Sequence, residues 1–569
     1  MANCPNCNAP LEDDARFCAN CGAAITPAEQ AAAPETAAPE TIFCPNCGEQ
    51  TSAAFEYCEH CGAALNASGG QKEKKAGGPG MKKWLICGGI VVIAAALVIV
   101  LISIFGGGGG KGYGLYIKEG EIFYSKLSKN GAWQLTSDLY DDAGNRELAY
   151  ASGSISSWIT MSSDGKTLFF PDKLGGGVTL YYRGTSGKKD AVKIDSDISY
   201  YAVNDSASLV TYLKNGNLYQ YAMSSDEKNK LAGDVYTFYV SDDGKRILFL
   251  DDEDTLYELN SGKDKEKLDS DVTIVRTVSD DCKTIIYQKD DILYLMQDGK
   301  ERVKIASDVF SVIRAYQTGE AYYTERDDDE ITLYYFDGKK SEEVTDEFGS
   351  SFAGSYKTPV LVYRDEDDEF WLAAGLKTTE LDAEDPRGFV FSEDGKSVWY
   401  VDEPDKNGEG ELYKITISNG TAKKAEKQDD DVYAGYVSYT DGGHLIYFKD
   451  VSDYEGELYV DGKKADDDVY FYSIGESDSG ALLYFTDYNS NKEYGTLMQY
   501  SGGKSAKIAD DVAQAYYTPN GSVLYLMDYS TSKYRGDLYV YSGSKSEKLD
   551  EDVVAIIPVT DSKYKGGGY

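Results

Sequence analysis

The feature that most constrains the fold of this 569-residue chain is an acidic turn that recurs through its C-terminal part. Four of these turns end in Asp residues spaced 37 residues apart, and four more follow: Asp197, Asp234, Asp271, Asp308, Asp431, Asp468, Asp511 and Asp552. Between Asp234 and Asp271 lie four short hydrophobic segments, at 235–240, 246–250, 255–259 and around 265–268. None of them has apolar residues at helical spacing, so each repeat is predicted to consist of four β-strands.

The second strand of each repeat carries the clearest signal. It follows a turn such as SDDGK and continues as an apolar run, as at 162–170, 241–249, 279–287, 392–400, 440–448 and 518–526. Counting these strands gives about eleven repeats. Four strands in about 40 residues is the size of one blade of a β-propeller. The fold class is therefore predicted to be mainly β, with a propeller as its main domain.

The two ends of this repeat region complement each other. Residues 114–137 have strands two to four of a repeat without a first strand, whereas 553–559 have a first strand with no repeat after it. Joined, they would complete one blade and remove the open edges of the sheet array. Because about eleven blades exceed the usual four to eight of one ring, we expect two successive propellers that share or close on the terminal blade.

Repeats such as SSDGKTLFF and SDDGKRILF resemble TolB-type and related bacterial propellers of unassigned function, over residues 113–560. The resemblance brings no catalytic residue with it. Peptidases that carry propellers also carry an α/β-hydrolase domain, and this chain has no G-x-S-x-G nucleophile motif. Only His60 and His444 are available for chemistry that needs a histidine base. The protein is therefore not expected to be an enzyme.

Eight of the ten cysteines lie in the first 61 residues, in two sets with the same spacing, C-x2-C-x10-C-x2-C. The members are Cys4, Cys7, Cys18 and Cys21, then Cys44, Cys47, Cys58 and Cys61. Two pairs of thiolates on short knuckles are what a tetrahedral four-cysteine zinc site requires. The sequences CPNC and FCANCG, and then CPNCG and YCEHCG, resemble short bacterial zinc ribbons over residues 3–25 and 43–65. We expect two structural Zn²⁺ ions, one in each set.

Other roles for the cysteine sets are less favoured. Disulfides would give the same even count, but not in the reducing compartment expected for this end of the chain. A catalytic zinc keeps an open position that four thiolates would close. Residues 1–65 hold nine acidic residues against one basic residue, Arg16, so they would repel a nucleic acid. A cytoplasmic protein partner or a purely structural role is expected instead.

Residues 84–105 are 22 consecutive positions without a charge. As a helix they would span roughly 33 Å, enough for the hydrocarbon core of a bilayer. The segment lies too far from the start to be an ordinary removed signal peptide, so a signal anchor is expected. Lysines 72, 74, 75, 82 and 83 precede it, whereas only Lys111 and Lys118 follow closely. The positive-inside rule then predicts a single-pass cell-membrane protein with a cytoplasmic N-terminus and an extracytoplasmic C-terminal domain.

The expected domain order is zinc ribbon 1 (1–25), an Ala/Pro linker (26–42), zinc ribbon 2 (43–65), a basic linker (66–83), the transmembrane helix (84–105), a glycine tether (106–112), the propeller (113–560) and a tail (561–569). The formal charge of the chain is −39. After the membrane segment, 51 basic and 86 acidic residues leave −35. That charge argues against a nucleic-acid partner, because phosphate contacts need clustered Lys and Arg.

The Asp-rich turns are interpreted as solvated connections in which Asp caps and bends the chain. Calcium binding is the alternative: Asp487, Asn489, Asn491 and Glu493 offer oxygens at alternate positions, although the glycine and distal glutamate of a calcium loop are absent. Most of the 48 tyrosines are assigned to packing on half-buried strands. Exposed Tyr and Trp, including Trp371 and Trp399, are the alternative as a sugar-stacking surface.

Together these features predict a membrane-anchored, non-catalytic binding or sensing protein whose propeller recognises a protein or glycan of the bacterial cell envelope. Two alternatives remain open. One is a surface-tethered carbohydrate-active enzyme that uses propeller carboxylates, because the sequence does not show which two of them lie about 5–10 Å apart. The other is a scaffold that only spaces an assembly.

Overall fold

The computed structural model describes residues 41–43, 50–52 and 114–561, except 120, 126–131, 137–147, 150–154, 174–176, 186–189, 329, 519–520 and 559. The chain divides into two compact parts: 30–109, and 1–29 together with 110–569. The eight predicted zinc ligands, the predicted transmembrane helix 84–105 and the linkers beside it lie outside the described residues. Within the described ranges, no helix has the length and apolar character needed to cross a membrane.

In the smaller part, β1 (Thr41–Phe43) and β2 (Gln50–Ser52) form a two-stranded antiparallel sheet. Thr41 pairs with Ser52, and Phe43 pairs with Gln50. The pairing brings together the two ends of the segment that contains Cys44 and Cys47.

The larger part is built from groups of four antiparallel strands, one group for each sequence repeat. In one of them, β13 (Val235–Val240), β14 (Arg246–Asp251), β15 (Leu256–Asn260) and β16 (Glu266–Asp269) pair in chain order. These strands agree with the predicted segments to within one or two residues. We number the repeats as units 1 to 11, and this sheet is unit 4.

Units 5 to 7 are also separate sheets whose strands pair in chain order. Unit 5 contains β17 (Ile274–Val278), β18 (Thr284–Lys289), β19 (Ile292–Gln297) and β20 (Val303–Ala306). Unit 6 contains β21 (Val309–Ala315), β22 (Ala321–Asp327), β23 (Glu330–Phe336) and β24 (Ser341–Thr345). Unit 7 contains β25 (Phe348–Gly354), β26 (Val360–Asp365), β27 (Phe370–Ala374) and β28 (Lys377–Glu380).

The remaining units, apart from unit 1, are joined into larger sheets. An eight-stranded sheet holds units 2 and 3: β6 (Thr160–Met161), β7 (Thr167–Pro171), β8 (Val178–Gly184), β9 (Val192–Val203), β10 (Leu209–Lys214), β11 (Asn217–Ala222), β12 (Glu227–Ala232) and, beside β6, β44 (Thr560–Asp561). A fourteen-stranded sheet holds units 8 to 11: β29 (Arg387–Phe391), β30 (Ser397–Asp402), β31 (Glu409–Ser418), β32 (Thr421–Ala422), β33 (Glu426–Tyr439), β34 (Leu445–Ser452), β35 (Glu455–Val460), β36 (Lys463–Glu476), β37 (Leu482–Asn489), β38 (Tyr494–Ser501), β39 (Lys504–Tyr517), β40 (Val523–Ser530), β41 (Arg535–Tyr541) and β42 (Ser546–Val553). The sheets merge because β9, β33, β36 and β39 each serve as the last strand of one unit and the first strand of the next.

Unit 1 is assembled from both ends of the repeat region. Its sheet has the order β43 (Ala555–Ile557), β3 (Gly114–Lys118), β4 (Glu121–Ser125) and β5 (Ala132–Gln134). Leu115 pairs with Ile557, and Ile117 pairs with Ala555. The predicted complementarity of the two ends is therefore confirmed. With this sheet, the described residues contain eleven units, as the sequence predicted.

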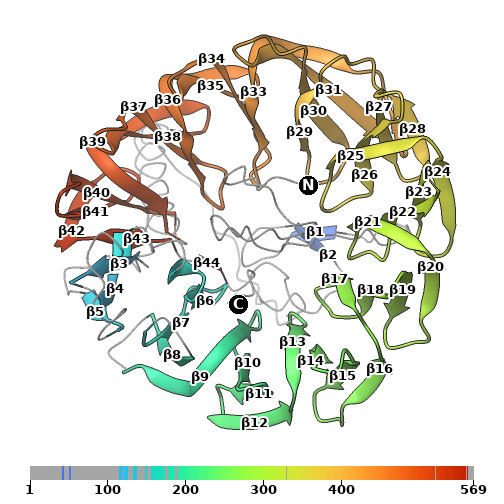
Figure 1. The fold of residues 1–569 in the computed structure, drawn as a ribbon. Helices are drawn as coiled ribbons and strands as arrows, with labels where there is room; N and C mark the ends of the chain where they lie inside the picture. Colours follow the sequence, from blue (N-terminus) through green and yellow to red (C-terminus); the bar gives the residue numbers. More distant parts are fainter. Residues whose placement is uncertain are drawn as a thin grey trace, which may run out of the picture. The chain divides into compact units, whose positions relative to one another are not determined.

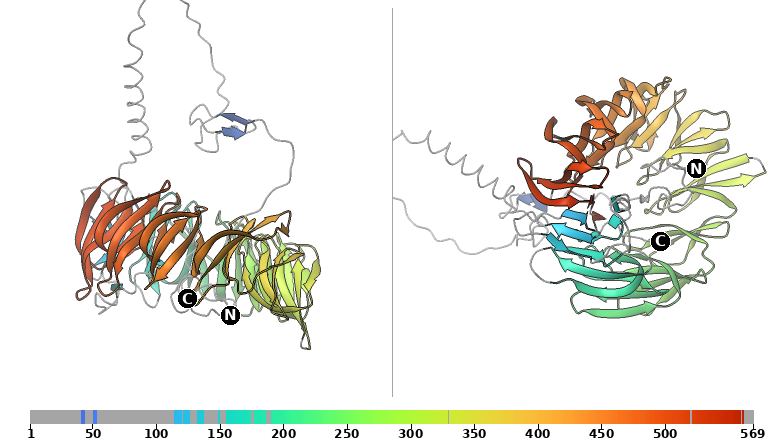
Figure 2. Two further views of the ribbon diagram at one scale, coloured as in Figure 1. Left: turned by 90° about the horizontal axis from the view of Figure 1, so that it is seen from above. Right: turned by 60° about the vertical axis from the view of Figure 1, so that its left-hand side comes forward.

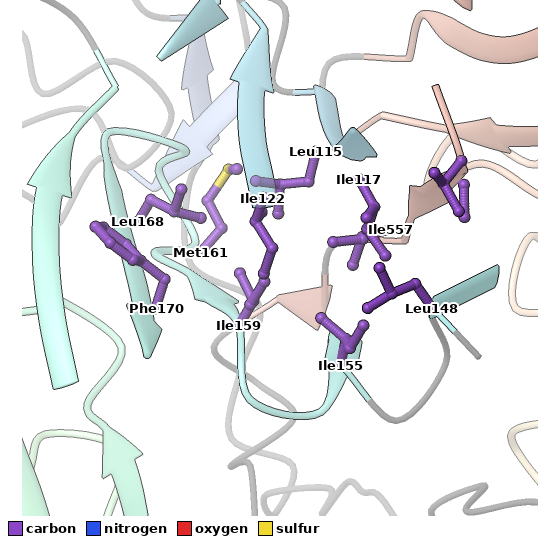
Figure 3. Packing of buried hydrophobic residues seen from close by; sticks show 12 residues of the cluster. Leu115, Ile117, Ile122, Leu148, Ile155, Ile159, Met161, Leu168, Phe170 and Ile557 are labelled. Atoms are coloured by element: carbon purple, nitrogen blue, oxygen red, sulfur yellow. The ribbon is translucent and has the colours of Figure 1, made fainter. Parts of the chain in front are cut away.

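The second strand of each unit reads as an apolar run because both of its faces are covered. In β14, Ile247 and Phe249 pack with unit 3, whereas Leu248 and Leu250 pack with unit 5. A strand that lies between two neighbouring sheets has no solvent face, so the alternation of polar and apolar residues is lost. Eleven apolar clusters result, each joining one unit to the next. Figure 3 shows the cluster between units 1 and 2.

The eight repeated Asp residues share one backbone conformation. All of them have positive φ, between 50° and 59°. Asp and Asn tolerate this left-handed region better than other side chains that carry a Cβ. Each Asp lies where the last strand of one unit passes into the first strand of the next, either within one continuous strand, as Asp197 does in β9, or between two strands, as Asp234 does between β12 and β13. The recurrence of Asp is thus explained by backbone conformation as well as by solvation.

The units follow one another around a single ring in a propeller-like arrangement, with the first strand of each unit nearest the centre (Figure 1). Figure 2 shows the same sheets from other directions, standing side by side. The two successive rings expected from the sequence are therefore wrong. Two rings would need contacts between sheets that are not consecutive, whereas the apolar clusters join consecutive units, and the last of them joins unit 11 to unit 1.

A polar contact repeats at these joints. Tyr116 Oη donates to Asp550 Oδ2 at 2.6 Å, and Lys118 Nζ donates to Asp550 Oδ1 at 2.7 Å. An Asp on the last strand of one unit thus accepts from a Tyr and a Lys two positions apart on the second strand of the next unit. The same arrangement recurs at three further joints: Asp195 with Tyr212 and Lys214, Asp269 with Tyr287 and Lys289, and Asp429 with Tyr447 and Lys449. We call this contact the Asp–Tyr–Lys clasp. At Asp550 it connects residues 434 positions apart in the chain.

Candidate functional site

Large aromatic side chains are exposed on the first strands of several units, which line the inside of the ring (Figure 1). They are Tyr236 on β13, Phe310 on β21, Phe352 on β25, Tyr472 on β36 and Tyr516 on β39, with exposed fractions between 38% and 75%. Single exposed apolar residues are ordinary, but a group on one surface marks a candidate interaction site. The inner strands therefore form the candidate site.

The turn conformation determines which residue is exposed. Each left-handed Asp is followed by a buried aliphatic residue, such as Val235 or Val309, and the next side chain lies on the opposite side of the strand. If the Asp is counted as the first position, Tyr236 and Phe310 occupy the third. In units 3 to 6 the repeated turn thus presents one exposed side chain per unit at the inner surface.

The densest group of aromatic residues lies where units 9 and 10 meet. We call it the aromatic cluster and define it as Tyr433, Tyr436, Phe448, Tyr454, Tyr470, Phe471, Tyr472 and Tyr488. Phe471 is 5% exposed and contacts five of the other rings. Tyr454 and Tyr472 have centroids 5.7 Å apart and are 59% and 66% exposed. Buried rings therefore support two rings that face solvent.

The inner strands of units 9 and 10 are irregular at this cluster. Between the pairs Val432–Lys449 and Val437–Tyr447, the inner strand advances five residues and its neighbour advances two. Between Tyr470–Phe485 and Gly475–Leu483 the same difference recurs in unit 10. Extra residues of this kind bend a strand and redirect side chains, and they are over-represented near active sites. The additional residues carry Tyr436 in unit 9, and Phe471 and Tyr472 in unit 10.

Tyr454 lies in an unusual backbone position. It is the second residue of the two-residue turn between β34 and β35, and Asp453 and Tyr454 have φ of 51° and 71°. Turns of this geometry favour Asn-Gly, and a bulky residue with positive φ costs about 1–2 kcal/mol. Backbone strain of this kind is concentrated at functional sites. The turn holds an aromatic ring at its tip where glycine would be the less strained residue.

Carboxylates surround the aromatic cluster. Glu455 Oε1 accepts a hydrogen bond from the backbone amide of Tyr488 at 2.8 Å. Burial raises the pKa of Glu455, and the charges of Asp468, Asp487 and Asp453 raise it further against the opposing effect of that hydrogen bond. Among the described residues, no Lys or Arg forms an ion pair with any of these four carboxylates. The surface beside the exposed rings is thus strongly negative.

The sequence-based candidates for sugar stacking are not exposed in the way the alternative requires. Trp399 is 6% exposed and belongs to the apolar cluster between units 8 and 9. Trp371 is half-buried and its Nε1 donates to Asp365 Oδ2 at 2.8 Å. The exposed aromatic residues are instead phenylalanines and tyrosines, and the tyrosines are ones that the sequence assigned mainly to packing.

The calcium alternative is not supported by the geometry. Asn489 and Glu493 lie at the turn between β37 and β38, where the Asn489 carbonyl accepts from the Glu493 amide at 2.7 Å. Asn489 Oδ1 accepts from the Lys492 amide at 3.1 Å. Over the described ranges, no three His, Cys, Asp or Glu side chains are placed to hold a metal ion. This turn is closed by its own backbone.

Two cavities lie away from the aromatic cluster. One, of about 460 Å³, contains Asp394 and Lys396, whose charged atoms are 2.9 Å apart. The other, of about 610 Å³, contains Arg302, which binds Asp269. The Asp394–Lys396 pair is exposed to solvent, and two further carboxylates, Glu266 and Glu301, line the second cavity.

The eight predicted zinc ligands lie outside the described residues. The β1–β2 sheet flanks one of the predicted knuckles, because Phe43 precedes Cys44 and its partner Gln50 follows Cys47 by three positions. Two cysteines close together in the sequence suit a zinc knuckle, and four thiolates match the donor preference of Zn²⁺.

Solved structures with likeness to this chain include three proteins. One is dipeptidyl peptidase 4 of Porphyromonas gingivalis, with 13% identity and a TM-score of 0.34, covering 62% of this chain and 59% of the peptidase. Another is a eukaryotic initiation factor, with 10% identity and a TM-score of 0.35, covering 71% of this chain and 98% of the factor. The third is the β-propeller domain of Cps50 (Swd1) of Myceliophteria thermophila, with 12% identity and a TM-score of 0.24, covering 52% of this chain and 93% of that domain. The match to the peptidase thus spans less than two thirds of its length. Likeness of this degree assigns no function.

No curated protein sequence matches the chain. Residues 4–65 match the double zinc ribbon family. This segment contains both cysteine sets, and the match supports zinc binding by the N-terminal part of the chain.

Proposed function

We propose that this protein is a single-pass membrane protein that binds a protein or glycan of the cell envelope without catalysing a reaction. In this proposal the zinc ribbons are cytoplasmic, 84–105 is the anchor, and the repeat region is extracytoplasmic. The 22 uncharged positions of the anchor and the excess of lysines before it support this topology.

The binding domain is proposed to be one closed, eleven-bladed β-propeller. The pairing of β43 with β3, the apolar cluster between units 11 and 1, and the clasp at Asp550 support closure. Closure removes the exposed sheet edges that would otherwise pair with another chain. A ring of this kind provides a rigid frame on which loops and inner strands can carry a binding surface.

The zinc ribbons are proposed to hold one ion in each set of four cysteines, Cys4, Cys7, Cys18 and Cys21, and Cys44, Cys47, Cys58 and Cys61. Zinc supplies folding energy to a small segment that cannot form a sufficient apolar core, and a site with four thiolates has no open position for a substrate. The ribbons therefore serve a structural role or contact a cytoplasmic protein.

The observation that carries the proposal is the aromatic cluster. Two exposed tyrosine rings rest on a buried aromatic base, beside carboxylates that lack a cation in the described part of the chain. Such a surface suits recognition, because aromatic rings supply contact area at a low cost in side-chain entropy.

Two measurements on the full-length protein test the proposal. External protease added to intact cells should cleave 113–560 and leave the zinc ribbons intact; the opposite pattern would refute the topology. The protein in detergent should bind one or more cell-wall glycan fragments or envelope proteins saturably without product formation. Turnover that is abolished by replacing a single carboxylate would instead establish a surface-tethered carbohydrate-active enzyme.

A further inference from the structure

Some tyrosines of the described repeats have a Lys or Arg over the ring, whereas the exposed rings of the aromatic cluster have none. Lys265 Nζ lies 4.4 Å from the Tyr257 ring, Arg302 lies 4.8 Å from the Tyr294 ring, and Lys449 Nζ lies 5.2 Å from the Tyr459 ring. No Lys or Arg of the described chain lies over Tyr454 or Tyr472 in this way. These two rings are therefore free to accept a cation from another molecule.

The internal contacts also show what such a cation needs. Arg302 lies over Tyr294 and binds Asp269, and Lys449 lies over Tyr459 while its Nζ donates to Asp429 at 2.9 Å. In both cases a positive group lies between an aromatic face and a carboxylate. The aromatic cluster provides the same two elements, because Asp453 and Glu455 flank Tyr454 in the chain and Asp468 and Asp487 act on Glu455.

We infer that the aromatic cluster between units 9 and 10 is the docking surface for a basic segment of a partner protein, which places a Lys or Arg side chain against Tyr454 and Tyr472. The inference rests on the proposed binding function and names the chemistry of the partner. A cation is favoured over a neutral sugar because ring faces and carboxylates both attract positive charge. The formal charge of −35 after residue 105 would also steer a basic segment towards the repeat region.

The strained turn supports this assignment independently of charge. A glycine at position 454 would relieve the positive φ of 71°, yet a tyrosine lies there with 59% of its surface exposed. Packing on Phe471, at a centroid distance of 5.9 Å, fixes the ring but covers less than half of it. The remaining ring surface is available to a partner.

The test uses the full-length protein in detergent and a fluorescein-labelled octalysine peptide, followed by fluorescence anisotropy at low and physiological salt. Octalysine is expected to bind, and the double variant Tyr454→Ala/Tyr472→Ala is expected to weaken binding roughly 10-fold, because two cation–ring contacts are lost without a change of net charge. Tyr236→Ala is the matched control. It removes an inner-strand tyrosine of unit 4 that is even more exposed, at 75%, and should change the affinity less than about 2-fold, as should Tyr454→Phe, which keeps a ring.

Three outcomes would overturn the inference. Octalysine does not bind the wild-type chain, or it binds the double variant as tightly as wild type, or Tyr236→Ala weakens binding as much as the double variant. If a tetrasaccharide of N-acetylglucosamine binds and depends on Tyr454 and Tyr472 while octalysine does not, the surface binds glycans; the cationic partner is then wrong and the proposed binding function stands. Equal thermal unfolding of all variants excludes misfolding as the cause.

Discussion

The clasp at Asp550 is predicted to hold the two ends of the repeat region together, and Asp550→Ala tests this directly. The Tyr116 side chain is 1% exposed, and removal of its acceptor would leave a buried hydroxyl without a partner. That loss costs about 1–3 kcal/mol. The Lys118 and Asp550 side chains form an ion pair and are only 22% and 24% exposed, so the pair adds about 1 kcal/mol. The expected destabilisation is therefore about 2–4 kcal/mol.

Two measurements follow from this magnitude. An unfolding entropy of about 2.1 cal/mol/K per residue over a repeat region of about 450 residues gives an expected decrease in Tm of roughly 2–4 °C. Hydrogen exchange should increase roughly 30-fold or more in β3 and β43, because about 1.4 kcal/mol corresponds to a factor of ten in the opening equilibrium. The two affected segments lie at opposite ends of the sequence, so a joint effect reports on closure.

The matched control is Asp195→Ala, which removes the same kind of clasp between units 2 and 3. Asp195 accepts from Tyr212 Oη at 2.9 Å and from Lys214 Nζ at 2.8 Å. This variant should lower the Tm by a similar amount while β3 and β43 stay protected. If Asp550→Ala leaves both the Tm and the exchange of β3 and β43 unchanged while Asp195→Ala is destabilising, the clasp does not hold the ends together.

Three further predictions address acid stability, the repeated turn and zinc. Burial would raise the pKa of Asp269, but hydrogen bonds from Lys289, Arg302, Tyr287 and the Ser270 amide outweigh burial and lower the pKa to about 2. Because the folded pKa lies below the unfolded value, about 2 kcal/mol of stability should be present above pH 4 and lost as the pH falls from 4 to 2. Asp269→Asn should flatten this part of a curve of Tm against pH. Asp234→Ala should lower the free energy of unfolding by roughly 1 kcal/mol, because position 234 has a φ of 58° that alanine adopts poorly. Asp234→Gly should change the free energy of unfolding by only about a few tenths of a kcal/mol, because glycine adopts this φ readily. Equal losses in thermal unfolding would contradict the conformational role of the turn. Replacing Cys44 and Cys47 by Ser should halve the zinc content measured by mass spectrometry of the purified chain, and an unchanged content would refute the proposed ligand set.

The strands, their number and the joining of the two ends could be predicted because each shows as a local pattern in the sequence, including the incomplete repeat at either end. The apolar second strand repeats along the described units and the left-handed Asp recurs at eight of them, so one unit reveals the others. The number of rings could not be predicted in this way. It depends on the angle at which neighbouring sheets pack, which is set by side chains from two units such as Phe249 and Val235 on one side and Leu213 on the other.

The clasp was missed although it leaves a sequence signal. Tyr and Lys two positions apart in a strand lie on the same face, and the motif recurs as YIK, YLK, YQK and YFK at 116–118, 212–214, 287–289 and 447–449. The Asp that receives both donors lies two residues before the left-handed Asp of the turn, as Asp195 does before Asp197. Only the fold reveals that these residues belong to neighbouring units.

The aromatic cluster also leaves a signal, in the length of the first strand. From the left-handed Asp to the start of the second strand is 14 residues in units 9 and 10, at Asp431 and Asp468, against 12 in unit 4, at Asp234. The longer interval marks the extra inner-strand residues that carry Tyr436 and Tyr472. Which tyrosines face solvent depends on packing across two units, so the sequence alone could not separate them from the buried ones.

The repeat itself explains how a regular ring can carry a specific surface. The left-handed Asp and the buried residue after it recur together, but in units 3 to 6 the third position is exposed and differs from one unit to the next: Ser199, Tyr236, Thr273 and Phe310 occupy it. A side chain there contributes little to the apolar clusters, so its replacement changes the inner surface without weakening the joints between sheets. Recognition can therefore depend on the residues that do not repeat, and units 9 and 10 extend this variation by lengthening the inner strand itself.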